Sequence, residues 1–321
     1  MKSIVRTKKL ALVVLSHVDK DHIVGLLDFL AALEEDDAND RPRRTAVAGL
    51  WHNSFRDTID PDGEITTRMQ MLMTMAGSTG VAMPLAADSF FGVKEGHHLR
   101  ILARKLSIPI NKGFDDDLII VETAVEPISL GRLKLQVVGP NQANLDALRA
   151  EWLAWLGSTE RRMAADPSTL ANSDGSVPNL SSIVLLAECD GKTILLTGDA
   201  RSDHTLSGLE QAGLLTDGKL HVDVFKVAHH GSNRNATRTF FKKVTADKYV
   251  ISANGRDGNP DHDTMVWIVE AAHAAGREIE IIVTNSTPST KMLKQTHKPA
   301  DFGYTLTVMP EDKHSIAVTL A

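Results

Sequence analysis

The sequence contains an uninterrupted apolar run, LALVVL, at residues 10–15. A half-exposed strand alternates apolar and polar residues, so a run without alternation predicts a strand that is buried on both faces. From Ile23 to Leu33, apolar residues recur three and four positions apart, which is typical of a helix with one buried face. A buried strand that leads into an amphipathic helix indicates a fold in which strands and helices are mixed.

The rest of the chain continues this mixture. Residues 183–188 and 193–197 predict a β-hairpin, because Asp190-Gly191 between them suits the left-handed backbone of a tight turn. Helices are expected over most of 68–107 and over 145–156 and 265–275. Further strands are expected at 118–122, 133–138, 222–228, 248–252 and 279–284. We therefore predict a mixed α/β sandwich formed by a single domain over 1–321, with a helical insertion at about 55–110.

Composition excludes several classes of protein. The 321 residues include 35 Lys and Arg against 41 Asp and Glu, a formal charge of −6, and 42% are hydrophobic. These values are typical of a globular protein and exclude a disordered or collagen-like chain, or a surface that coats polyanions. The single cysteine, Cys189, excludes an internal disulfide and a thiolate zinc finger. Any metal must therefore be bound by His and carboxylate side chains.

The apolar segments are short. None approaches the ~20 residues of a membrane span, and the run at 10–15 is too short for the core of a signal peptide. We therefore expect a soluble, cytoplasmic protein with no membrane partner. The sequence does not indicate an oligomeric state.

Three predicted strands each end in residues that can hold a cation. The run 10–15 leads into HVDKDH at 17–22, the strand 193–197 into Gly198-Asp199, and the strand 222–228 into HHGS at 229–232. Side chains at strand ends are held by a rigid scaffold and converge in the loops above it. We expect donors from all three segments to meet at a common cation centre. Taken singly, each segment also fits an ordinary role as a loop, a turn or a helix cap.

In this order, the motifs resemble the metallo-β-lactamase superfamily, and in particular the branch similar to the metallohydrolase domain of competence DNA-uptake channel proteins. The resemblance covers roughly residues 8–285 and rests on HVDKDHIVGL, NLSSIVLLAECDGKTILLTGDA and VFKVAHHGS. It implies an αββα sandwich with one or two zinc ions, or manganese, in a cleft at its edge. By position, it implies that His17 and Asp19 bind the first ion, that Asp21 and His22 bind the second, that Asp199 bridges them and that His229 completes the set. It also implies catalytic roles for Asp21 and Asp199 and a substrate contact for His230.

Two features depart from this family pattern. Members begin with two strands before the first ligand motif, whereas sixteen residues precede His17, so we expect the first strands of the N-terminal sheet to be absent. A start codon placed too late, a degenerate copy, or a fold that tolerates the loss would each explain this. Relatives also often carry a His before a Gly-Asn-Pro-Asp turn, where this chain has RDGNPDH at 256–262. Asp257 and His262 are the candidate replacements.

The expected chemistry is hydrolysis. Two hard cations lower the pKa of a bridging water from 15.7 to about 7–9, which makes metal-bound hydroxide the nucleophile, and they polarise the bond that is cleaved. Asp19, where a His is more frequent, makes the site more anionic and favours phosphate substrates once the ions are bound. Arg234, Arg238 and Lys242 are spaced as a row on one helix. Such a row either follows a phosphate backbone or is an exposed basic face.

Three functions follow from this reasoning. The first is metal-dependent cleavage of phosphodiester bonds, as a nuclease or phosphodiesterase with nucleic acid or a small phosphodiester as its partner. The second is hydrolysis of a carboxylic ester, thioester, lactone or amide, which a narrow apolar pocket lined by Met69–Met75 would indicate. The third is a non-catalytic member that acts through interaction, which the short N-terminal segment favours.

Overall fold

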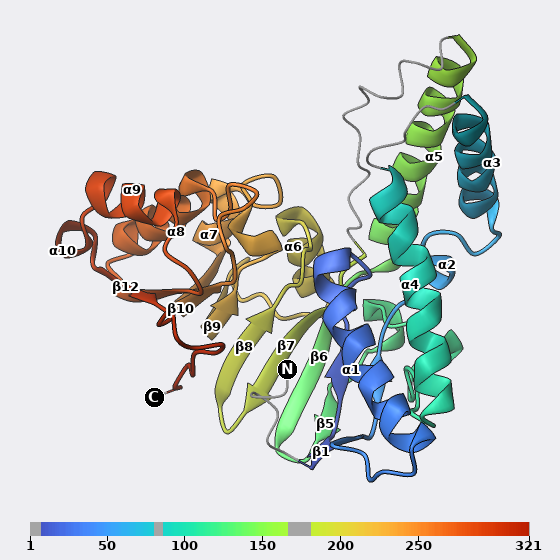
Figure 1. Cartoon of the computed structure of the whole chain (residues 1–321). Helices are drawn as coiled ribbons and strands as arrows, with labels where there is room; N and C mark the ends of the chain where they lie inside the picture. The colour runs from blue at the N-terminus through green and yellow to red at the C-terminus, as the bar shows by residue number, and fades with distance from the viewer. Residues whose placement is uncertain (1–7, 80–85, 166–180, 321) are drawn as a thin grey trace. The chain divides into compact units, whose positions relative to one another are not determined.

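The computed structural model describes residues 8–79, 86–165 and 181–320, with side chains except at 76–79, 86–93 and 116. Contacts divide this part of the chain into two compact units. The first holds residues 8–79, 86–119, 142–165 and 181, and the second holds residues 120–141 and 182–320. Both units mix strands with helices (Figure 1), so the predicted mixed α/β class is confirmed.

In the first unit, the predicted strand at 10–15 is present as two short strands. β1 (Lys9–Leu10) pairs in parallel with β3 (Ala46–Val47), and β2 (Val13–Val14) pairs in parallel with β4 (Leu50–Trp51). The prediction of burial on both faces is wrong, since Val14 remains 37% exposed. Two-stranded sheets of this length offer too little surface for other elements to cover both faces.

Helices make up the rest of the first unit. Helix α1 (Lys20–Ala38) shares an apolar core with α4 (Ala86–Lys105), in which Ile23 and Leu30 meet Leu99. The predicted insertion range 55–110 also contains α2 (Phe55–Thr58) and α3 (Glu64–Thr79). Helix α5 (Gln142–Ala165) pairs with α3, because the Arg68 guanidinium donates two 2.8 Å hydrogen bonds to the Glu160 carboxylate.

The second unit is built on an eight-stranded sheet with the order β12-β11-β10-β9-β8-β7-β6-β5. Neighbouring strands are antiparallel from β5 to β8 and parallel from β8 to β12. The strands are β5 (Ile128–Leu130), β6 (Leu133–Gly139), β7 (Val184–Cys189), β8 (Lys192–Leu196), β9 (Leu220–Lys226), β10 (Val244–Ile251), β11 (Ile279–Val283) and β12 (Tyr304–Val308).

Four helices cover one face of this sheet (Figure 1): α6 (Ser202–Gln211), α7 (Arg238–Lys243), α8 (His262–Ala274) and α9 (Pro288–Thr296). The short α10 (Pro299–Phe302) precedes β12. Leu195 and Phe225 are cross-strand partners in this core, where the Phe225 ring contacts Phe241 and Tyr249. None of the helices in the described ranges is both long and apolar enough to span a membrane.

The structure confirms the predicted hairpin and corrects one predicted strand. Asp190 and Gly191 have φ of 52° and 78°, the left-handed conformation that a tight turn between β7 and β8 needs. Residues 118–122, expected as a strand, instead run into a short 3₁₀ turn, Val121–Thr123. The reason is Asn53, whose side chain donates to the Ile119 carbonyl at 2.7 Å and accepts from its amide at 2.9 Å. A side chain thus takes the main-chain groups that a neighbouring strand would use.

Candidate metal centre

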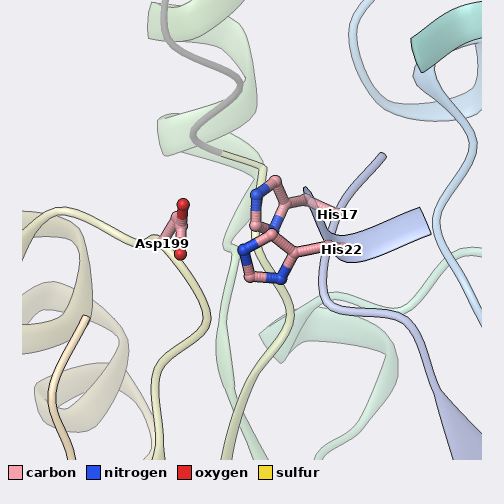
Figure 2. A group of neighbouring side chains, drawn as sticks. All are labelled: His17, His22 and Asp199. Carbon is pink, nitrogen blue, oxygen red and sulfur yellow. The ribbon is translucent and has the colours of Figure 1, made fainter. Parts of the chain in front are cut away.

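The first motif places two imidazole rings beside each other at the start of α1. His17 follows β2 and is 2% exposed, and His22 lies in the first turn of the helix. The ring centroids are 4.0 Å apart and the ring planes are tilted by 48° (Figure 2). Helical side chains lean toward the helix N-terminus, which directs the His22 ring back toward the end of the strand. Local geometry alone therefore brings these two predicted ligands together.

A carboxylate accompanies each of these rings. His17 Nε2 lies 3.5 Å from Asp19 Oδ2, and His22 Nε2 lies 3.5 Å from Asp21 Oδ2. The side chains of Asp19 and Asp21 are 39% and 58% exposed. Both acids precede or begin the first turn of α1, where the helix dipole favours negative charge. The set therefore combines sheltered nitrogen donors with oxygen donors that solvent can reach.

In the second unit, Asp199 stands at the end of β8 with its main chain held on both sides. Its amide donates to the Ser182 hydroxyl at 3.0 Å, and its carbonyl accepts from Asn235 Nδ2 at 2.8 Å. Gly198 before it has φ of 51°, which lets the chain leave the strand in a sharp turn. The Asp199 side chain is only 9% exposed. A buried carboxylate carried on a main chain held in this way is suited to binding a cation.

Asn235 also determines which nitrogen of His229 carries the proton. Because the Asp199 carbonyl can only accept, the Asn235 NH₂ group must face it, and Oδ1 must face His229. His229 Nδ1 lies 2.6 Å from that oxygen and is therefore the protonated nitrogen. In the neutral ring the lone pair is then on Nε2, which is 3.9 Å from Asp199 Oδ2, too far for a hydrogen bond. His229 thus presents the form of imidazole that binds metals.

The loop that carries His229 has an unusual backbone. His229, His230 and Gly231 have φ of 46°, 55° and 82° in succession. A left-handed conformation is costly for a residue with a side chain, at about 1–3 kcal/mol, so packing around the loop must maintain it. His230 Nδ1 lies 2.6 Å from the Ser252 carbonyl, and a Cβ on Gly231 would lie 2.8 Å from Pro260. Such strain is concentrated at functional sites in proteins.

Two residues that the sequence analysis missed are Lys226 and Asn235. Burial lowers the pKa of the Lys226 ammonium at the end of β9, and the charge of Asp199 opposes that shift. Asn235 lies six positions after His229 and belongs to no motif, so no pattern in the sequence marks it. Its role depends on the fold, which brings it to both Asp199 and His229.

A third missed residue is His52, which follows β4 just as His17 follows β2. The position after a buried strand was a signal in the sequence. Its side chain is fully buried, and burial lowers the pKa of the imidazole to about 3, with a smaller contribution from the charge of Arg100. Within the described residues, neither ring nitrogen has a hydrogen-bond partner. His52 is therefore a neutral imidazole inside the first unit.

The structure corrects the predicted basic row. Helix α7 begins only at Arg238, because Thr237 caps it by accepting a hydrogen bond from the Phe240 amide. Arg234 lies in the preceding turn and is exposed, so Arg234 and Arg238 do not share a helix face. Arg238 instead pairs with Glu270 of α8. The substrate roles proposed for these arginines and for His230 remain predictions.

The two candidate replacements in the last motif lie in different settings. Asp257 is exposed in a turn. His262 begins α8, and its Nε2 is 3.1 Å from the Thr296 hydroxyl of α9. Between them, Asp261 accepts a 2.8 Å hydrogen bond from the Asn233 amide and so ties this turn to the His229 loop.

The donors fit a divalent transition-metal ion. Figure 2 shows His17 and His22, from the first unit, and Asp199, from the second. The first unit offers two imidazoles, and the second offers a carboxylate and the imidazole of His229; both kinds of donor suit zinc and manganese. No protein-family model matches the sequence, and no curated protein matches it either.

Proposed function

We propose that this protein is a metal-dependent hydrolase of phosphodiester bonds. The observation that carries the proposal is that two sets of donors are already in place. His17 and His22 lie side by side at the start of α1, and Asn235 forms hydrogen bonds to both Asp199 and His229. Both sets stand at strand ends, where catalytic side chains gather. We propose further that they serve a common centre of one or two zinc or manganese ions in a metallo-β-lactamase-like fold, which the sequence motifs resemble.

The chain's own groups would prepare this centre for catalysis. A bound divalent cation would supply Lewis-acid polarisation of the phosphoryl group and would make water acidic enough to attack at neutral pH. In the neutral ring, Asn235 holds the proton of His229 on Nδ1, so that Nε2 is the nitrogen available to a metal. Asp21, with the more exposed carboxylate of the first set, can accept a proton from water. Asp199 supplies a buried carboxylate on a main chain that Ser182 holds in place.

The surroundings of α3 favour a phosphate substrate over an acyl substrate. The acyl alternative requires an apolar pocket lined by Met69–Met75. Met69 is 1% exposed in the core, whereas Met71 and Met75 are 60% and 52% exposed. The cavity that α3 borders is lined by Thr66, Gln70 and several charged residues, and no methionine among the described residues lines it. This polarity suits an anionic ligand better than an acyl chain.

A panel of substrates tests the proposal. Full-length protein loaded with zinc or manganese is assayed on bis-p-nitrophenyl phosphate, single-stranded DNA, duplex DNA and a thioester. We expect cleavage of phosphodiesters and none of the thioester. His22→Ala and Asp199→Ala should each lower the rate by roughly 100-fold or more, whereas Asp203→Ala, an exposed carboxylate on α6, should not. Wild-type rates in Asp199→Ala would contradict the proposal.

Metal content tests whether the two donor sets serve one centre. In a common centre, His22→Ala and Asp199→Ala should each weaken binding of the same ion or ion pair, and the double variant should lose no further equivalents. Two independent sites would instead give losses that add. If the purified wild-type chain holds less than half an equivalent of metal and cleaves nothing after reconstitution, the non-catalytic alternative is correct.

A further inference from the structure

A cavity of about 740 Å³, lined mostly by polar and charged residues, lies within the first unit, between α2, the first half of α3, and α4. This volume lies within the range of about 300–1,000 Å³ that is common for small-ligand sites. Four cationic side chains line the cavity: Arg56, Lys94, Arg100 and Arg104. His97 lines it as well. The cavity belongs to neither set of metal donors described above.

The carboxylates in this cavity are already occupied. Asp57 accepts a 2.7 Å hydrogen bond from Arg100. Asp60 caps α3, since its two oxygens accept from the amides of residues 65 and 66 at 2.8 and 2.9 Å. Asp62 accepts from Arg149 of α5 at 2.6 Å. Each acid thus already accepts hydrogen bonds from an arginine or from main-chain amides.

Two of the four cationic side chains, Arg56 and Arg104, lack such partners among the described residues. Arg56 and Arg104 are exposed at the cavity, and neither guanidinium forms an ion pair or hydrogen bond with any residue that the structure describes. The same is true of the His97 ring. Two guanidinium forks that face one cavity without a carboxylate partner are suited to phosphate, which they can bind through two hydrogen bonds each.

The cavity adjoins the first donor motif within the same unit. Gly96 forms part of its wall, and a Cβ placed there would lie 3.1 Å from Val18 Cγ1 and 3.4 Å from His52 Nε2. Val18 directly follows His17. One glycine therefore separates the cavity from the strand end that carries His17 and from the buried imidazole of His52.

We propose that this cavity binds the phosphate groups of a nucleotide-sized ligand, with Arg56 and Arg104 as the recognition residues. The claim that this cavity is the substrate site of the hydrolase rests on the proposed function. The claim that it binds phosphate does not depend on a bound metal. Phosphate is the shared chemistry of two sources, an oligonucleotide segment and a free inorganic phosphate compound. The size of the cavity favours the former, because pyrophosphate would fill only part of it.

Calorimetric titration of the metal-free full-length chain tests this proposal. The probes are the 5′-phosphorylated dinucleotide pTpT, inorganic pyrophosphate, and thymidine as a ligand without phosphate. We expect pTpT to bind, thymidine not to bind, and the double variant Arg56→Ala/Arg104→Ala to bind pTpT at least about tenfold more weakly. The slope of log affinity against log salt should also fall by about 1.4 for two lost phosphate contacts. Arg132→Ala, an 81% exposed arginine in the second unit, is the matched control.

The outcomes separate this proposal from the proposed function. Unchanged pTpT affinity in the double variant, with thermal unfolding like that of the wild type, overturns the cavity proposal whatever the enzyme cleaves. If pyrophosphate binds as tightly as pTpT and depends on the same arginines, the phosphate site stands and its ligand is the inorganic source. If Asp199→Ala binds pTpT normally while the wild type cleaves no phosphodiester, the site stands and the proposed function fails. Should the double variant unfold, Arg104→Lys retains the charge without the fork and should still weaken binding.

Discussion

Asn235 makes two hydrogen bonds that link both ligands of the second donor set, and Asn235→Ala removes both. The residue is 6% exposed, donates to the Asp199 carbonyl at 2.8 Å and accepts from His229 Nδ1 at 2.6 Å. A buried carbonyl left without its donor costs about 1–3 kcal/mol. The His229 side chain is 36% exposed and can find water instead. We therefore expect a loss of about 2 kcal/mol in the free energy of unfolding of the metal-free protein.

The loss of metal affinity should follow from the same contacts. Without Asn235, His229 is free to rotate and to protonate either nitrogen. Removal of a hydrogen-bond partner of a metal-binding His typically lowers metal affinity 10–100-fold. Zinc or manganese titration measures this, and nitrogen NMR of the metal-free chain reports directly whether His229 carries its proton on Nδ1. The nearby Asn233→Ala is the control, because the contact of Asn233 to Asp261 uses its main-chain amide.

Two results would refute this reasoning. Asn235→Ala with wild-type metal affinity would show that Asn235 does not position His229. A neutral His229 ring with its proton on Nε2 rather than Nδ1 in the wild-type protein would show that the assigned tautomer is wrong, whatever the stability of the variant.

Three further predictions concern packing and pH. Gly231→Ala should lower the free energy of unfolding by more than about 2 kcal/mol, because φ is 82° and the new Cβ would lie 2.8 Å from Pro260. Gly213 has a φ of 66° but open space around it, so Gly213→Ala should cost only about 1 kcal/mol. Urea unfolding measures both variants. His52 has a folded-state pKa of about 3 against 6.5 when unfolded. Below pH 6.5 the unfolded chain therefore binds a proton at His52 that the folded chain does not. The free energy of unfolding should fall as the pH drops from about 6.5 toward 3, by up to about 1.4 kcal/mol per pH unit. If the stability of His52→Gln falls just as steeply with pH, this prediction is wrong. Gly208→Ala would place a Cβ 1.8 Å from a carbonyl oxygen of β6 and should abolish the folded state as judged by circular dichroism; a cooperative melt near the wild-type temperature would refute it.

Local sequence patterns predicted the elements that depend on local forces. The hairpin of β7 and β8 follows from its turn residues, and α8 follows from its helical spacing. Two predictions failed where a side chain competed for main-chain groups. Asn53 took the amide and carbonyl of Ile119 from a possible strand, and Thr237 started α7 after Arg234.

The sequence by itself determined that the chain mixes strands and helices and that His and Asp side chains follow its strands, because periodicity and turn chemistry act over a few residues. The contact between the His17 and His22 rings is also local, since the end of a strand and the first turn of a helix bring together residues five positions apart. Only the tertiary structure decided the tautomer of His229 and the arginine-lined cavity of the first unit. Both depend on which polar and charged groups lie next to each other once residues far apart in the chain have packed together. A local sequence pattern cannot predict those neighbours.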